Sequence, residues 1–164
     1  MSGPTLVIKA HGIPQVQGNH RVSRAGGFAK IRDANPDLPG WRLLVSTLAR
    51  QGWTHPMILG PVRLEVDFWL KRPKTAPKSI DIRPMTRGGG DWDKLARAIG
   101  DSLVDAGVMK DDSQIVTAVV DKRYAVTRDL HRIFREGFHW EQPGAHIRVS
   151  EIIEPSPVEM NGES

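Results

Sequence analysis

The clearest pattern of hydrophobic and polar positions lies in residues 61–70, where every second residue is apolar: Val62, Leu64, Val66, Phe68 and Leu70. This period of two predicts a β-strand that buries one face. A shorter alternation predicts a first strand at residues 5–10. Residues 114–124 contain a denser apolar run, which predicts a third strand that is buried in its sheet.

Two segments instead show the period of an amphipathic helix. The first lies between Asp37, a residue type common at the N-cap, and Gly52, which favours a helix end. The second begins near Asp91 and ends at Gly107. The side of the second helix that we expect to be buried carries Leu95, Ile99, Ser102, Leu103 and Ala106.

Two polar segments connect these elements. Residues 15–36 include three glycines and several basic residues, among them Arg21 and Arg24, and predict a loop that is either solvated or in contact with phosphates. Residues 71–90 hold six basic residues against one acid, so we expect a mobile cationic loop that buries too little apolar area to become ordered alone. The candidate phosphate ligands of this second loop are Arg72, Lys74, Lys78, Arg83 and Arg87.

Composition limits the classes of function. The 164 residues predict one domain, residues 1–153, followed by an acidic tail, residues 154–164, that we expect to be disordered. The tail holds three of the 19 acidic residues and none of the 23 basic ones, so the domain carries +7 and suits a polyanionic partner. No segment predicts a membrane span or an export signal, and the lack of cysteine fits a reducing compartment, so we expect a cytoplasmic protein.

Two pairs of acidic residues bracket the second predicted helix. Asp91 and Asp93 lie at its start, where the helix dipole favours negative charge, so they are either ordinary helix-start residues or metal ligands. Asp111 and Asp112 lie in the turn before the third strand. If the two pairs converge, repulsion between the carboxylates requires a cation, and oxygen ligands without cysteine favour Mg²⁺, with Mn²⁺ as a substitute. The sequence leaves that convergence open.

These motifs resemble those of the RusA-type Holliday junction resolvases of phages and prophages. The resemblance is strongest in residues 91–98, 101–103, 110–116 and 122–124, and it extends to residues 12–14, 66–74 and 143–149. It implies that residues 143–149 form the last strand. It also implies a small α/β (α+β) fold with the element order β-α-β-α-β-β, in which a mixed sheet packs against two main helices.

The resemblance further implies a Mg²⁺-dependent homodimer that cuts four-way DNA junctions and needs no small organic cofactor. Asp91, Asp93 and Asp112 match the catalytic, metal-binding aspartates of the family. Asp111 would then orient a ligand or a water molecule. A four-way junction has approximate two-fold symmetry, so a symmetric dimer would place one site on each of two opposed strands.

Two residues depart from the usual family pattern. The family usually has asparagine where this chain has Lys94, and lysine where it has Arg97. We expect Arg97 to clamp the scissile phosphate and not to act as a general acid, because a guanidinium group is a poor proton donor. Lys122 would be a further phosphate ligand, and a short basic helix predicted within residues 126–143 would contact either DNA or the partner subunit.

Two other functions remain compatible with these residues. One is a protein that binds branched DNA on the same fold without cutting it, which the replacements at Lys94 and Arg97 favour. The other is an unrelated enzyme that uses the acids on a smaller phosphate substrate, for which a long basic loop would be excessive.

Overall fold

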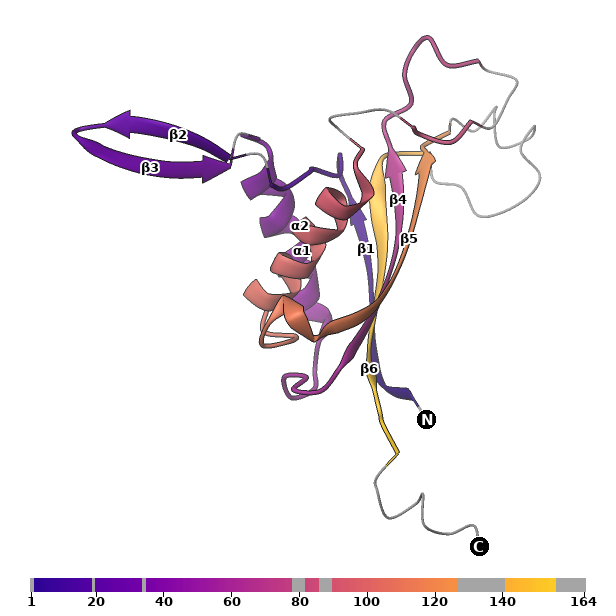
Figure 1. Ribbon diagram of the computed structural model, residues 1–164. Helices are drawn as coiled ribbons and strands as arrows, with labels where there is room; N and C mark the ends of the chain where they lie inside the picture. Colours follow the sequence, from indigo (N-terminus) through magenta and orange to yellow (C-terminus); the bar gives the residue numbers. More distant parts are fainter. Residues whose placement is uncertain are drawn as a thin grey trace, which may run out of the picture.

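The computed structural model describes residues 2–18, 20–33, 35–77, 82–85, 90–126 and 141–155. Its centre is a four-stranded sheet in the order β1-β6-β4-β5, formed by β1 (Ser2–His11), β6 (Gly144–Ile152), β4 (Val62–Leu70) and β5 (Ile115–Tyr124). β4 and β5 are parallel, whereas β6 is antiparallel to β1 and β4. Helices α1 (Leu38–Gly52) and α2 (Trp92–Asp105) cover one face of the sheet (Figure 1). The expected mixed sheet packed against two helices is therefore confirmed.

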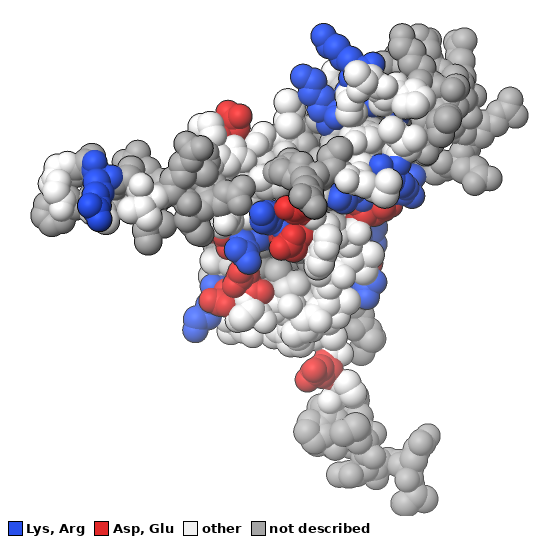
Figure 2. Space-filling model, turned by 45° about the horizontal axis from the view of Figure 1, so that its top comes forward, with Lys and Arg blue, Asp and Glu red and all other residues white. Residues whose placement is uncertain are grey.

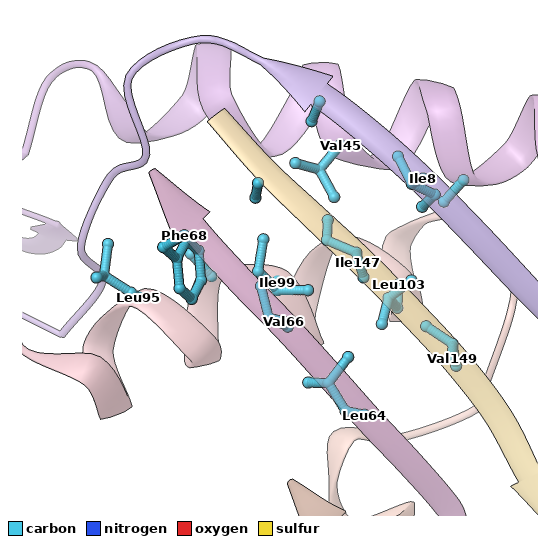
Figure 3. Close-up of a cluster of buried hydrophobic side chains, with 14 of the residues drawn as sticks. Ile8, Val45, Leu64, Val66, Phe68, Leu95, Ile99, Leu103, Ile147 and Val149 are labelled. Atoms are coloured by element: carbon cyan, nitrogen blue, oxygen red, sulfur yellow. The ribbon is translucent and has the colours of Figure 1, made fainter. Parts of the chain in front are cut away.

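The hydrophobic core lies between this sheet and the two helices. The even-numbered residues of β4 are buried as predicted, from 0% exposure at Val62 to 7% at Leu70. Each large apolar side chain buried here contributes roughly 1.5–3 kcal/mol, so the buried face of α2 fixes the rotation of the helix about its axis. That rotation decides where the polar residues of α2 point. Figure 3 shows the side chains that meet across this layer, which include Leu95, Ile99 and Leu103 of α2 and Leu64, Val66 and Phe68 of β4.

Both helices end where the sequence predicts. Gly107 follows α2 with a φ of 75°, a conformation that glycine adopts without steric cost. The backbone N–H of Val108 then donates to the carbonyl oxygen of Leu103 at 3.1 Å, which closes the helix end. α1 begins after Asp37 and ends at Gly52, although the Asp37 side chain makes no capping hydrogen bond.

Residues 15–36 do not form the predicted loop throughout, because they contain a β-hairpin. Its strands are β2 (His20–Ala25) and β3 (Phe28–Asp33), which pair with each other in a separate two-stranded sheet. Gly26 and Gly27 both have positive φ, 66° and 79°, as a two-residue hairpin turn requires. The glycines that indicated a loop are therefore the turn of a hairpin, which projects away from the rest of the domain (Figure 1).

The prediction that β5 is buried was wrong. β5 forms the edge of the sheet, because it pairs with β4 on one side and has no strand on the other in the described chain. Val116 is 63% exposed and Val119 is 48% exposed. Ile115 and Val120, in contrast, pack against the core. The apolar run indicates a strand correctly, but its neighbours in the fold decide how much of it is buried.

Some predicted features lie outside the described residues. They are Lys78, Arg87, the short basic helix expected within residues 126–143, and residues 156–164 of the acidic tail. Within the part of the chain that is described, no helix is long and apolar enough to cross a membrane.

Candidate active site

The first acidic pair lies at the start of α2. Asp91 occupies the N-cap position with an extended backbone, and Asp93 lies in the first turn. The Asp91 side chain makes no capping hydrogen bond to this helix start. Asp93 is exposed, and a carboxylate oxygen of Asp91 lies 3.4 Å from the amino nitrogen of Lys94. The two carboxylates therefore lie beside the positive end of the helix dipole without being used as caps.

The end of β5 returns to this helix start. The Lys122 amino group donates a hydrogen bond of 2.5 Å to the carbonyl oxygen of Gly90, the residue before Asp91. This contact follows from the topology, since α2 carries the chain back along the sheet and β5 then runs parallel to β4. Lys122 is thus beside the acidic pair and holds the backbone that leads into it.

The loop that precedes the hairpin runs along another side of α2. The backbone N–H of Gln17 donates to the carbonyl oxygen of Lys94 at 3.1 Å, and the Gln17 side-chain amide donates to the Asp101 carboxylate. Gly18 has a φ of 123°, and a Cβ at this position would lie 3.3 Å from a guanidinium nitrogen of Arg97. No pattern in the sequence indicates these contacts, because they depend on a loop that is remote from α2 along the chain.

Asp111 has a structural role in the turn after α2. Its carboxylate accepts a 2.9 Å hydrogen bond from the backbone N–H of Ser113, at the start of the short 3₁₀ helix η1 (Asp112–Gln114). The Gln114 side-chain oxygen accepts in return from the backbone N–H of Asp111 at 2.9 Å. The hydrogen bonds from Ser113 hold the pKa of the Asp111 carboxyl below its usual value. Asp111 is therefore an anionic cap of η1.

Asp112 lies beside the middle of α2. A Cβ built on Gly100 would lie 3.7 Å from the Cβ of Asp112 and 3.4 Å from the Cδ1 of Ile115. Gly100 is seven residues after Asp93, which corresponds to about 10 Å along a helix, and positions i and i+7 lie on the same side. Asp112 and Asp93 thus lie on one side of α2, about two turns apart.

This geometry brings the predicted metal ligands only partly together. Asp91 and Asp93 are neighbours at the helix start, and their oxygen atoms suit a hard divalent cation. Asp112 does not complete a cluster with them. Among the described residues, no three Asp, Glu or His side chains are close enough to hold one metal ion.

A family model described as Endodeoxyribonuclease RusA matches residues 11–131. The chain belongs to this family. The matched region contains the loop before the hairpin, α2 and η1, so it includes all the acids of the candidate site. A search of curated proteins finds no match. Membership in the RusA family implies an endodeoxyribonuclease, a hydrolase that acts on branched DNA.

The other cations expected to contact DNA in this RusA family member have varied surroundings. Arg83 donates to a carboxylate oxygen of Asp121 at 2.7 Å and to the carbonyl oxygen of Lys122 at 3.2 Å. Burial opposes ionisation of Asp121, but Arg83 and Arg123 together outweigh it and hold the pKa of that carboxyl below its usual value. Arg83 therefore attaches its loop to the end of β5. Arg72 donates to the carbonyl oxygen of Pro77.

Lys74 and Arg24 are exposed, the first in the loop after β4 and the second on the hairpin. Figure 2 shows basic and acidic side chains interleaved on one face of the molecule, with one basic side chain also on the projecting hairpin. The side chain of Arg21 is not among those described. Charge on this face is therefore mixed, and cations stand next to acids at the start of α2.

Proposed function

We propose that this RusA family protein is a structure-selective endonuclease that requires a divalent metal ion and resolves four-way DNA junctions. The observation that carries the proposal is the start of α2, where two carboxylates that cap nothing lie beside Lys94 and Lys122. Phosphodiester hydrolysis needs an acidified water molecule and positive charge around the phosphate. Carboxylates and cations at one helix start supply the protein groups for both needs.

Asp91 and Asp93 would hold the metal ion, which we propose to be Mg²⁺ with Mn²⁺ as a substitute. When bound, the ion would supply a more acidic water molecule and neutralise charge on the phosphate. Arg97 would bind a phosphate oxygen, since its exposed guanidinium group is always charged. Lys122 would keep the backbone before Asp91 in place through its bond to Gly90.

A homodimer fits this reaction, because paired symmetric nicks need two equivalent sites. The absence of cysteine fits the reducing cytoplasm, where we propose that the protein acts.

Asp112, beside Gly100, would contribute to catalysis from a position about 10 Å along the helix from Asp93.

The test compares Asp93→Asn with the unaltered protein on a synthetic immobile junction in Mg²⁺. Nicking should be lost because a ligand charge is removed, while junction binding should stay equal or become tighter because one repulsive charge is gone. Mn²⁺ binding, followed by its electron paramagnetic resonance signal, should weaken in the same variant. Asp105→Asn is the matched control, since Asp105 lies at the other end of α2 and pairs with Arg42 at 2.5 Å. Full nicking by Asp93→Asn in Mg²⁺ would overturn the proposal.

A second candidate is a protein that binds branched DNA without cutting it. The contact between Lys94 and Asp91 favours it, because an ammonium group at 3.4 Å competes with a metal ion for that carboxylate. Purified protein that binds junctions but nicks none in Mg²⁺ or Mn²⁺ would support this candidate.

A further inference from the structure

The β2–β3 hairpin is held by little except its own pairing. Its two strands contact each other, and neither packs substantially against another described helix or strand. All of its residues whose exposure is described are exposed, including Val22 at 66% and Arg24. A two-stranded ribbon without a core is only marginally stable in water. A hairpin that projects in this way, with every described side chain exposed, is better suited to binding a partner than to stabilising the domain.

The base of the hairpin is attached to the candidate active site. On one side, Gln17 and Gly18 contact α2 at Lys94 and Arg97. On the other side, the Asn35 side-chain amide donates to the carbonyl oxygen of Val16 at 3.2 Å and to the Gln15 side chain at 2.9 Å. The Asn35 side-chain oxygen also accepts from the backbone N–H of Asp37 at 3.1 Å, which ties the base to α1. The hairpin therefore starts from a fixed position next to Arg97.

Strand register divides the charges of the hairpin unequally between its two faces. Arg21 pairs with Arg32, and Ser23 pairs with Lys30. Because successive residues of a strand alternate between faces, these pairs share one face, which has three basic residues and no acid. The opposite face is mixed, since its pairs are His20 with Asp33, Val22 with Ile31, and Arg24 with Ala29.

We propose that this hairpin is a DNA-binding arm that lies along the duplex leaving the cleavage site, with its basic face toward the phosphates. The inference rests on the proposed function, in which the substrate is DNA. Six-residue strands span about 20 Å, or roughly six base pairs at 3.4 Å each. A two-stranded ribbon is also narrow enough to enter the major groove. The arm thus adds binding surface for the duplex beyond what the start of α2 can reach.

The experiment measures junction affinity against salt concentration in the Asp93→Asn background, so that cleavage does not interfere. The slope of log affinity against log salt falls by about 0.9 for each phosphate that the protein no longer neutralises. The triple variant Arg21→Gln, Lys30→Gln, Arg32→Gln should therefore lower the slope by about 2.7. Arg32→Gln alone should lower it by about one and Arg24→Gln, on the other face, by less. Arg63→Gln, an exposed cation on β4, controls for the loss of one positive charge anywhere on the protein.

Two outcomes would overturn the arm. One is a triple variant whose salt slope equals that of its parent, which would indicate that the basic face binds an acidic protein partner and not DNA. The other is an equal loss in Arg63→Gln and Arg32→Gln, which would mean that only net charge matters. The proposed function is tested separately, by nicking with the unaltered protein. If the unaltered protein nicks junctions and the triple variant has the same salt slope as its parent, only the proposal of a DNA-binding arm is refuted. Circular dichroism of each variant should match the parent, because none of the hairpin side chains that the structure describes belongs to the core.

Discussion

Replacement of Gly100 by alanine is expected to stabilise the protein. Glycine in a helix interior costs about 1 kcal/mol relative to alanine. Gly100 lies in α2 without a positive φ, so its backbone accepts a side chain. The added methyl group would lie 3.4 Å from Ile115 and 3.7 Å from Asp112, both ordinary contact distances. The gain should therefore be about 1 kcal/mol, which raises the Tm of a domain of this size by roughly 2–4 °C.

Replacement of the same residue by leucine should have the opposite effect. The atoms beyond Cβ would enter the space of Asp112 and Ile115, and overpacking of this kind costs roughly 1–3 kcal/mol. Relief of the clash would move η1, and Asp112 with it, away from α2. We therefore expect Gly100→Leu to lower the Tm and to lose nicking activity, whereas Gly100→Ala keeps it.

Thermal unfolding and the junction-nicking assay together test this reasoning. Gly107→Ala is the matched control, because it adds the same methyl group at a φ of 75°, where a left-handed backbone costs roughly 1–2 kcal/mol for residues other than glycine. It should lower the Tm while Gly100→Ala raises it. A Tm that falls equally in both variants would refute the described environment of Gly100. Full nicking by Gly100→Leu would refute a role for Asp112 at this position.

Two further predictions concern single polar residues. Lys122→Met removes the hydrogen bond to Gly90, so it should slow nicking at saturating junction concentration more than it weakens junction binding. Lys122→Arg should recover part of the nicking rate. An equal loss in Lys110→Met, which removes an exposed lysine, would contradict this role of Lys122. Burial and the nearby Asp121 raise the pKa of Asp67 above its usual value, so ionised Asp67 opposes folding at neutral pH. Asp67→Asn should therefore raise the Tm at pH 7, and the gain should shrink toward pH 3, below the usual aspartate pKa of 3.8, where Asp67 is mostly protonated in both the folded and the unfolded state. A gain of equal size at both pH values would show that the charge is not its cause.

The sequence predicts best those elements whose hydrophobic periodicity results from packing against the core. β4 alternates because one face meets α2, and both helices carry apolar faces that pack on the same sheet. The hairpin pairs with no other strand and makes no substantial contact with another helix or strand in the described part of the chain, so packing against the core does not set its pattern. Its one local signal is the pair Gly26-Gly27, which indicates a turn as readily as a loop. Pairing between β2 and β3 is visible only in three dimensions.

The sequence predicts where the first acidic pair lies, but not the distances between the acids. Spacing along the chain places Asp91 and Asp93 at a helix start, and this agrees with the structure. The position of Asp112 depends on how the turn after α2 folds back, and the capping bonds between Asp111, Ser113 and Gln114 decide that locally.

Gly100 is a clue in the sequence to the position of Asp112. A glycine that weakens a helix by about 1 kcal/mol indicates a close neighbour when no local reason for it exists. The neighbour proves to be Asp112, on the side of α2 that Asp93 also occupies. Arg97 follows Asp93 by one turn, so it lies along the helix between the two acids. Under the proposed function, a phosphate bound to Arg97 would therefore have a carboxylate on each side of it, and Asp93 and Asp112 would act on it from opposite directions.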